Sequence, residues 1–277
     1  MFKLILAGMI RRTAMRHLCY NIGMNMRKIT YLSNAGVMVE LDEHKILIDT
    51  LCNSALPLYK NPPAELREEI IAGMAPFNNI EILLFTHHHS DHFDPESTAL
   101  FLKQHQNTVV ISSPEVITGL KDQFSQLENG RLIRQDIPFG GTGSFQIPGL
   151  TIQSLAMQHD GKEYQDVLNL AYLIEAAGKK IFHLGDAKPI AENYLHFNLI
   201  AQNIDLLLAP FPYIGLPSSR QLIEKYIQPQ KIAAIHLPVR ELDHQGWINS
   251  TVKSYLKVKA DFIETVFLEE PGAVLNL

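Results

Sequence analysis

The segment FTHHHSDHFD, residues 85–94, places four of the chain's 12 histidines and two aspartates directly behind a short apolar run. If the strand predicted for that run continues, the side chains of His87 and His89 point the same way, because strand side chains alternate between faces. Two imidazoles on one face can bind one metal ion. Asp91 and His92 follow where the chain turns toward a helix, and there they can reach a second ion. The spacing therefore predicts a metal site.

The ligand types narrow the choice of metal. Imidazole and carboxylate together suit zinc and its divalent neighbours manganese and iron. Two plainer explanations stay open for this segment alone. It is either a histidine-rich surface turn or a group of histidines that satisfy one another's hydrogen bonds inside a core.

Three further polar residues come directly after apolar runs in the second half of the chain. They are His159 after IQSLAMQ, Asp186 in IFHLGDA and His236 in KIAAIHLP. A single histidine beside a strand is usually structural, because imidazole packs and hydrogen-bonds well in a core. Three such residues, in this order and behind the first cluster, favour a complete set of metal ligands.

The ordered set resembles that of the metallo-β-lactamase fold hydrolases. The resemblance covers nearly the whole chain from Lys28 onward, including the opening ITYLSNAGVMVEL…KILIDT. There Asp49 matches a family aspartate that supports the site. The compact length and the LGDA motif around Asp186 are most similar to the branch that includes ascorbate-6-phosphate lactonase and many uncharacterised metal-dependent hydrolases.

The resemblance implies an α/β fold, an αββα sandwich of two mixed β-sheets flanked by helices, with the site along the open edge between the sheets. It also implies two divalent ions, Zn²⁺ first, with Mn²⁺ or Fe²⁺ as alternatives. Carried over by position, the first ion's ligands are His87, His89 and His159, the second ion's are Asp91, His92 and His236, and Asp186 bridges both. Asp91 is also the expected catalytic acid and base, since a carboxylate beside metal and water is placed for proton transfer.

Other residues near these motifs receive supporting roles. His88 has the opposite strand parity from its neighbours and His183 precedes the turn to Asp186, so we expect both to be structural or to orient the ligands. Loops that leave the ligand-bearing strands carry the candidate substrate-binding residues, because loops often carry function. These are Tyr164, Phe211, Tyr213, Arg240, His244 and Trp247.

Short apolar runs between turn residues predict strands, and proline or aspartate caps predict helix starts. The pattern favours layered α/β packing in a single domain, residues 27–277, behind an N-terminal extension, residues 1–26. We expect that extension to be dispensable for the site. It is either a basic surface helix or the result of a start codon assigned too early, with Met24 or Met26 as the true first residue. The predicted strands are 29–32, 37–41, 46–49, 82–85, 108–111 and 150–157, a hairpin turning near Gly178, and the runs IDLLLA and KIAAIHL; the predicted helices are 63–72, 94–105, 188–202, 219–226, and those from Pro114 and Asn249.

Composition sets limits on location and partners. The chain has 277 residues, and beyond Lys28 its net charge is about −11. This disfavours nucleic acid as a partner, because binding by counterion release requires a basic surface. Two scattered cysteines favour a reducing cytoplasm, and no apolar run has the roughly 18 residues of a membrane span. The segment MFKLILAGMIRR imitates a signal peptide but meets arginines where a cleavage site belongs.

The resulting hypothesis is a hydrolase that cleaves an ester, lactone, amide or phosphodiester bond of a small molecule, with homo-oligomerisation left open. One alternative is an iron-dependent dioxygenase or redox protein with the same ligands. The flavin-linked diiron members usually have a glutamate where His89 stands, whereas persulfide dioxygenases keep similar histidines. Another alternative is a catalytically silent binding module. A nuclease is disfavoured by the acidic body and by the lack of a long insertion.

Overall fold

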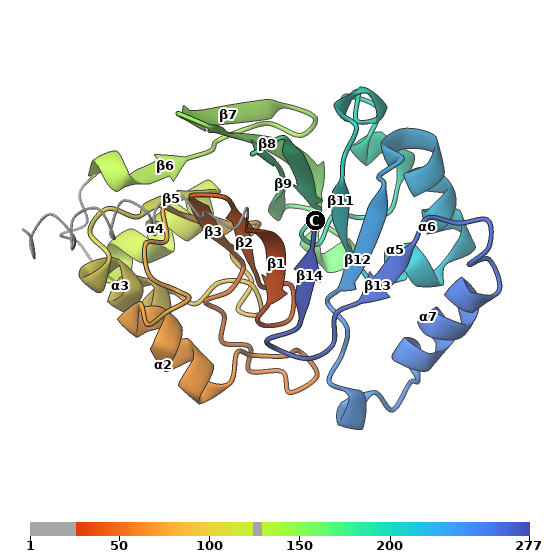
Figure 1. Cartoon of the computed structure of the whole chain (residues 1–277), viewed down its shortest axis with the longest axis horizontal. Coiled ribbons are helices and arrows are strands. Elements are labelled where there is room, and N and C mark those ends of the chain that lie inside the picture. Colours follow the sequence, from red (N-terminus) through yellow and green to blue (C-terminus); the bar gives the residue numbers. More distant parts are fainter. Residues whose placement is uncertain (1–25, 124–128) are drawn as a thin grey trace, which may run out of the picture.

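Two mixed sheets of seven strands each account for most of the apolar runs, as the computed structural model of residues 26–123 and 129–277 shows (Figure 1). The first sheet has the order β14 (Val274–Asn276), β1 (Arg27–Tyr31), β2 (Val37–Leu41), β3 (His44–Ile48), β4 (Ile82–Phe85), β5 (Val109–Ser112) and β6 (Leu132–Arg134). The second has the order β13 (Thr265–Phe267), β12 (Lys231–Ile235), β11 (Leu206–Pro210), β10 (Lys179–His183), β9 (Leu168–Ala176), β8 (Leu150–Gln158) and β7 (Thr142–Ile147).

Helices cover the outer face of each sheet (Figure 1). On the first sheet they are α2 (Ala64–Ala72), α3 (Pro95–Gln104) and α4 (Pro114–Gln123), and on the second α5 (Pro212–Gly215), α6 (Pro217–Leu222) and α7 (Trp247–Leu256). A π-helical segment, Ile223–Ile227, continues α6. The arrangement is the αββα sandwich of the metallo-β-lactamase fold that the sequence predicts.

The core divides into three apolar layers because strand side chains alternate between the faces of a sheet. In β9, Leu170, Tyr172 and Ile174 lie in the layer between the two sheets, whereas Ala171 and Leu173 lie against the helices of the second sheet. A third cluster joins the first sheet to α2, α3 and α4. Strands buried on both faces read as continuous apolar runs, which is why they stand out in the sequence.

Several predicted boundaries are confirmed and some are wrong. The strand at 82–85 is β4, and Asp94 caps α3 by accepting a hydrogen bond from Ser97 N at 3.0 Å. The predicted helix 188–202 is absent, and only two short 3₁₀ turns, Ala191–Asn193 and Ile200–Gln202, form in that range. Asn193 explains part of the difference, since its amide bonds the backbone of Gln158 at 2.7 and 3.0 Å and so competes with helical bonding.

The surface gives no sign of a membrane span. No helix among the described residues is long and apolar enough to cross a bilayer.

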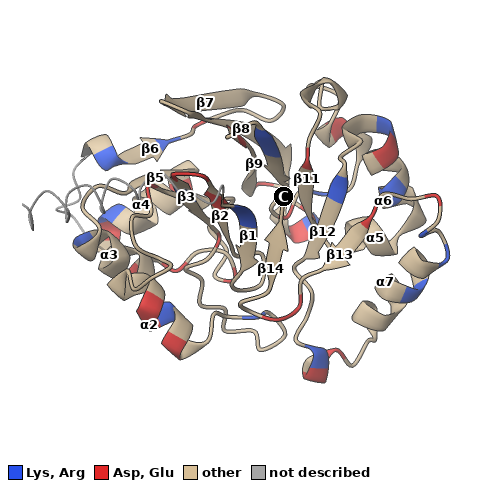
Figure 2. Ribbon diagram, viewed as in Figure 1, with Lys and Arg blue, Asp and Glu red and all other residues tan. Residues whose placement is uncertain are grey.

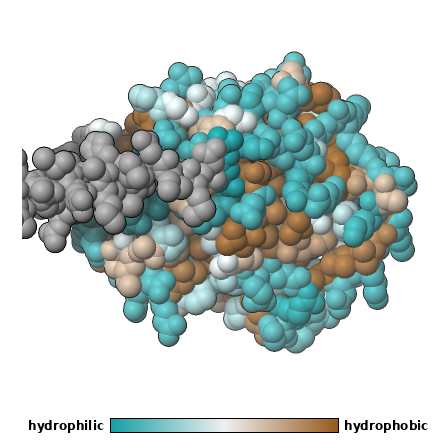
Figure 3. Space-filling model, in the orientation of Figure 1, coloured by the Kyte–Doolittle hydropathy of each residue, from teal (hydrophilic) through white to brown (hydrophobic). Residues whose placement is uncertain are grey.

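Acidic and basic residues are interspersed over the helices in the view of Figure 2. Figure 3 shows apolar residues gathered across the middle of one face, with polar residues around them. Apolar atoms normally make up more than half of a folded protein's surface, so this band alone identifies no binding site.

Candidate metal centre

The segments that follow four strands meet at one edge of the sandwich. His87 follows β4, His159 follows β8, Asp186 follows β10 and His236 follows β12. Within the second sheet, His159 and Ala187 form an isolated β-bridge, and the segments of the two sheets meet where Nε2 of His159 lies 3.2 Å from Nε2 of His87. The position matches the expected site at the open edge between the sheets.

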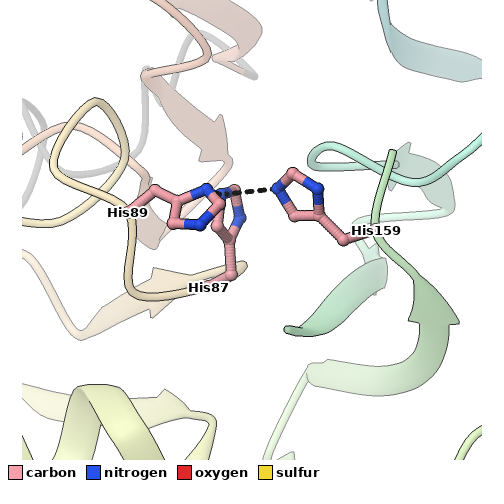
Figure 4. Close-up of side chains that lie close together, drawn as sticks. All are labelled: His87, His89 and His159. Atoms are coloured by element: carbon pink, nitrogen blue, oxygen red, sulfur yellow. Dashed lines mark hydrogen bonds between the residues drawn. The ribbon is translucent and has the colours of Figure 1, made fainter. Parts of the chain in front are cut away.

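His87, His89 and His159 form the first cluster (Figure 4). The Nε2 atom of His87 lies 3.0 Å from Nδ1 of His89 and 3.2 Å from Nε2 of His159. The strand ends at Phe85, as predicted, so the condition of a continued strand, on which the argument from strand parity depended, is not met. The irregular backbone after β4 nevertheless turns both imidazoles toward the same point.

Asp91, His92, Asp186 and His236 form the second cluster. The Oδ2 atom of Asp186 lies 3.3 Å from Nε2 of His92 and 3.3 Å from Nε2 of His236. The Oδ2 atom of Asp91 lies 3.5 Å and 3.3 Å from the same two nitrogens. Two carboxylates and two imidazoles therefore surround one small volume.

Asp186 lies between the clusters, at the position expected of a bridging ligand. Its Oδ2 atom is also 3.8 Å from Nε2 of His159 in the first cluster. The turn that presents Asp186 depends on Gly185, whose φ is +57°. A Cβ atom there would lie 2.5 Å from Asn169 Oδ1 and 2.7 Å from Thr86 Cβ, so only glycine fits.

Asp49 holds His92 from behind. Its Oδ2 accepts a hydrogen bond from Nδ1 of His92 at 2.8 Å, which leaves Nε2 pointing into the cluster. The same carboxylate accepts bonds from the backbone N and Oγ1 of Thr86 at 2.8 and 2.7 Å. Metal-binding histidines usually have such a partner on the far ring nitrogen. This geometry supports the expected role of Asp49.

Asn34 is a supporting residue that the sequence reasoning missed. Its side chain is fully buried and donates from Nδ2 to Oδ2 of Asp91 at 3.0 Å. Its backbone carbonyl accepts from the backbone N of His236 at 2.9 Å. Asn34 therefore positions two members of the second cluster, although in the sequence it was only a turn residue.

His88 and His183 lie where their expected supporting roles place them. His88 is exposed and its ring packs against His89 with centroids 5.3 Å apart. His183 is buried, donates from Nε2 to Ala35 O at 2.9 Å and accepts from Gly185 N at 3.0 Å. It stabilises the turn before Asp186 through Nδ1 and joins it to the turn between β1 and β2 through Nε2.

The two clusters differ in charge. Burial is the main cause that lowers the pKa of His87 well below its ordinary value and that of His89 to about 4, with the neighbouring histidines adding to it. In the second cluster burial also lowers the histidine pKa values, but the carboxylates outweigh it. They raise the pKa of His92 and bring that of His236 to about 9. In return, and against the effect of burial, His92 and His236 hold the pKa of Asp91 low.

The donor atoms fit a pair of divalent ions. Two nitrogens bound tetrahedrally to zinc at about 2.0–2.1 Å lie roughly 3.3 Å apart, close to the 3.0 and 3.2 Å of the first cluster. In the second cluster, Nε2 of His92, Nε2 of His236 and Oδ1 of Asp186 are buried without a hydrogen-bond partner. Buried polar atoms are seldom left without a hydrogen-bond partner, so the convergence of these three atoms fits a bound cation.

Comparison with known proteins agrees with this site. A family model described as the beta-lactamase superfamily domain matches residues 44–244. The chain belongs to this superfamily. It is 23% identical to a metal-dependent hydrolase of Pyrococcus abyssi over 91% of this chain and 100% of that one.

Two solved structures show the same superfamily fold. The metallo-beta-lactamase fold protein YhfI of Bacillus subtilis matches with a TM-score of 0.60 and 16% identity, over 90% of this chain and 98% of the other. The diiron β-hydroxylase CmlA of Streptomyces venezuelae matches with a TM-score of 0.60 and 13% identity, over 91% of this chain and 54% of the other. These likenesses show the fold alone, since one scaffold serves several chemistries.

In this beta-lactamase superfamily member a pocket of about 220 Å³ opens beside the clusters, and His159, Asp186 and His236 form part of its wall. Four of the expected substrate-binding residues line it: Tyr164, Phe211, Tyr213 and Trp247. Tyr213 forms part of the pocket wall, but its hydroxyl is no free donor, because it donates to Ala187 O at 2.8 Å.

Two other expected residues lie elsewhere. Of the described residues that line this pocket, none is Arg240 or His244. Arg240 pairs with Glu269 through Nε at 3.0 Å, so its charge is already matched. Tyr59 lines the pocket instead and packs edge-on against His236, with ring centroids 5.1 Å apart. It comes from an irregular segment that carries no motif, so no sequence pattern pointed to it.

Proposed function

We propose that this protein is a metal-dependent hydrolase that uses two divalent ions, Zn²⁺ first and Mn²⁺ or Fe²⁺ as alternatives, to cleave an ester, lactone, amide or phosphodiester bond of a small molecule. The observation that carries the proposal is the shared position of Asp186, whose Oδ2 lies within 3.8 Å of imidazole nitrogens from both clusters. The hydrolase name of the Pyrococcus relative supports the same activity. Two scattered cysteines favour the cytoplasm as its location.

The residues of the chain have separate tasks in this reaction. When bound, a pair of divalent ions supplies water activation at neutral pH and polarises the bond under attack. His87, His89 and His159 hold one ion, while Asp91, His92 and His236 hold the other. Asp186 faces both clusters, so its negative charge would reduce the repulsion between two dications bound there.

Asp91 accepts the proton released during attack. In the metal-free protein its pKa is held low by His92 and His236 against the effect of burial, and a bound cation would keep the carboxylate ionised in their place. Asn34 fixes the orientation of this carboxylate through the 3.0 Å bond from Nδ2 to Oδ2. A carboxylate held beside the reacting water is suited to take the proton and return it to the leaving group.

The test is a hydrolysis screen of the purified protein loaded with Zn²⁺, Mn²⁺ or Fe²⁺, using lactones, esters, acyl amides and phosphodiesters. We expect turnover in at least one class, and its loss in a His87→Ala, His159→Ala double variant. Metal-replete protein that cleaves none of these classes would contradict the proposal.

An iron oxygenase is the second candidate, because the CmlA hydroxylase shares this fold and is named a diiron enzyme. Oxygen uptake by the Fe²⁺-loaded protein with the same compounds separates the two functions. A hydrolase turns over with Zn²⁺ and without oxygen, whereas an oxygenase requires both iron and oxygen. A silent binding module shows neither activity.

A further inference from the structure

The pocket beside the clusters combines acidic and apolar groups. Among the described residues that line it, none is lysine or arginine. Its charged side chains are the carboxylates of Asp160 and Asp186 and the histidines of the metal centre. An anionic group on a substrate would therefore meet no matching cation beyond the metal ions.

The backbone around the pocket offers few donors to an anion. Pro189, Pro210, Pro212 and Pro238 all line it, and proline has no backbone N–H. These prolines come from three segments of the wall, at 189, 210–212 and 238, and each removes one backbone donor from it. Phosphate recognition normally requires arginine, lysine or free backbone N–H groups.

Among the described residues, the long helix α7 begins at this pocket with Trp247. Two of its first backbone N–H groups are already bonded. The backbone N of Trp247 and of Ile248 each donate to the carboxylate of Asp243, both at 2.9 Å. The helix end is thus neutralised by a side chain of the protein. A phosphate group there would have to compete with the carboxylate of Asp243 for these two donors.

Aromatic rings provide the remaining wall. Phe211 and Trp247 stack with centroids 6.2 Å apart and an interplanar angle of 25°. Trp247 is 43% exposed although it belongs to the pocket, and Tyr164 is 39% exposed while its ring packs edge-on against His89. Large aromatic side chains with free surface in a concave site are suited to cover an apolar ligand.

We propose, given the hydrolase function above, that the substrate is a small molecule that is uncharged away from the bond that is cleaved, and that its aromatic or apolar group lies against Trp247 and Phe211. The volume of about 220 Å³ limits this group to the size of one ring with a short substituent. The pocket therefore differs from what a phosphorylated lactone requires.

The first experiment compares three esters on the metal-loaded full chain. They are 4-methylphenyl acetate, 4-acetoxyphenyl phosphate, which carries a phosphate at the far end of the ring, and methyl acetate. We expect kcat/KM for 4-methylphenyl acetate to exceed that for the phosphorylated ester by at least about tenfold, because the charge would be desolvated without a partner. Equal rates, or a preference for the phosphorylated ester, would overturn the inference.

Variants test which residues cause the preference. We expect Trp247→Ala to lower kcat/KM for 4-methylphenyl acetate by about 3- to 10-fold while leaving that for methyl acetate nearly unchanged. Leu256→Ala is the matched control, since Leu256 lies on the same helix, is 57% exposed and is not part of the pocket. Lys188 is the nearest lysine in sequence to Pro189. If Lys188→Ala selectively reduces turnover of the phosphorylated ester, that lysine binds phosphate and the inference fails.

A binding measurement separates this inference from the proposed function. The chain contains a single tryptophan, so Trp247 emission reports on this pocket alone. We expect benzyl alcohol to change the emission saturably, and Tyr164→Ala to weaken that binding. Saturable binding without hydrolysis of any ester, lactone, acyl amide or phosphodiester would overturn the hydrolase function and keep the pocket assignment. Hydrolysis without a response of Trp247 to benzyl alcohol would do the reverse.

Discussion

Asp186 and His159 connect the two halves of the metal centre, with Oδ2 of Asp186 lying 3.8 Å from Nε2 of His159. His159 follows β8 and Asp186 follows β10, so the two residues approach each other only in the folded chain. The same oxygen lies 3.3 Å from His92 and from His236. One carboxylate oxygen thus faces ligands of both clusters.

This position predicts unequal effects of two substitutions. Asp186→Ala should reduce turnover by more than the 10- to 100-fold typical of residues that only support ligands, because it removes charge from between two dications. His88→Ala should reduce turnover by less than about tenfold, since His88 is exposed and belongs to neither cluster. Turnover numbers of the two variants on one substrate provide the check. Equal losses would show that the ligands are wrongly assigned.

Asp49 should control metal affinity without binding metal. Asp49→Asn removes the charge that accepts the 2.8 Å bond from His92 Nδ1, so we expect about 10- to 100-fold weaker binding at the second cluster. Asp136→Asn is the matched control, because that side chain is 73% exposed and lies outside the site. Competition with a metal-binding dye measures both affinities, and an unchanged affinity in Asp49→Asn would contradict the supporting role.

The two clusters should respond differently to pH. The pKa of His236 is raised to about 9 and that of His92 is also raised, so both are protonated in the metal-free protein at neutral pH. A metal ion must displace those protons, and its affinity for the second cluster should therefore fall as pH falls from 9 to 6.

The first cluster should show little such dependence over the same range. The pKa of His89 is lowered to about 4 and that of His87 is also lowered, so both rings are already neutral. Calorimetric titration in buffers with different ionisation enthalpies counts the protons released at each step. The His87→Ala and His236→Ala variants assign the steps to the two clusters. Proton release at the first cluster equal to or greater than that at the second would contradict this difference.

Removal of metal should also lower thermal stability. A ligand that binds only the folded state at about 100 times its Kd adds roughly 2.7 kcal/mol, which corresponds to a Tm shift of about 5–10 °C for a chain of this size. Scanning calorimetry before and after chelation, followed by readdition of Zn²⁺, measures the change. An unchanged Tm in protein confirmed to be metal-free would argue against resident ions.

The ligand segments were visible in the sequence because they combine rare residue types with a fixed place after apolar strands. Asn34 lies in the opening segment that carries the resemblance, but its contact with Asp91 spans 57 positions and only its turn character was visible; Tyr59 belongs to no motif. The side chains of His87 and His89 do converge, but strand parity is not the reason, because β4 ends at Phe85 and the backbone beyond it is irregular. Arg240 was expected in the pocket because its loop follows a ligand-bearing strand. Its pairing with Glu269, which matches its charge, could not be predicted from the sequence.

The most direct test of a two-metal centre is the number of ions bound per chain, measured by mass spectrometry of the native protein at saturating Zn²⁺. We expect two ions in the unaltered protein, and fewer than two in Asp186→Ala, because that carboxylate faces both clusters. A single ion in the unaltered protein, or two firmly bound ions in Asp186→Ala, would contradict the shared role of Asp186 on which the proposed function depends.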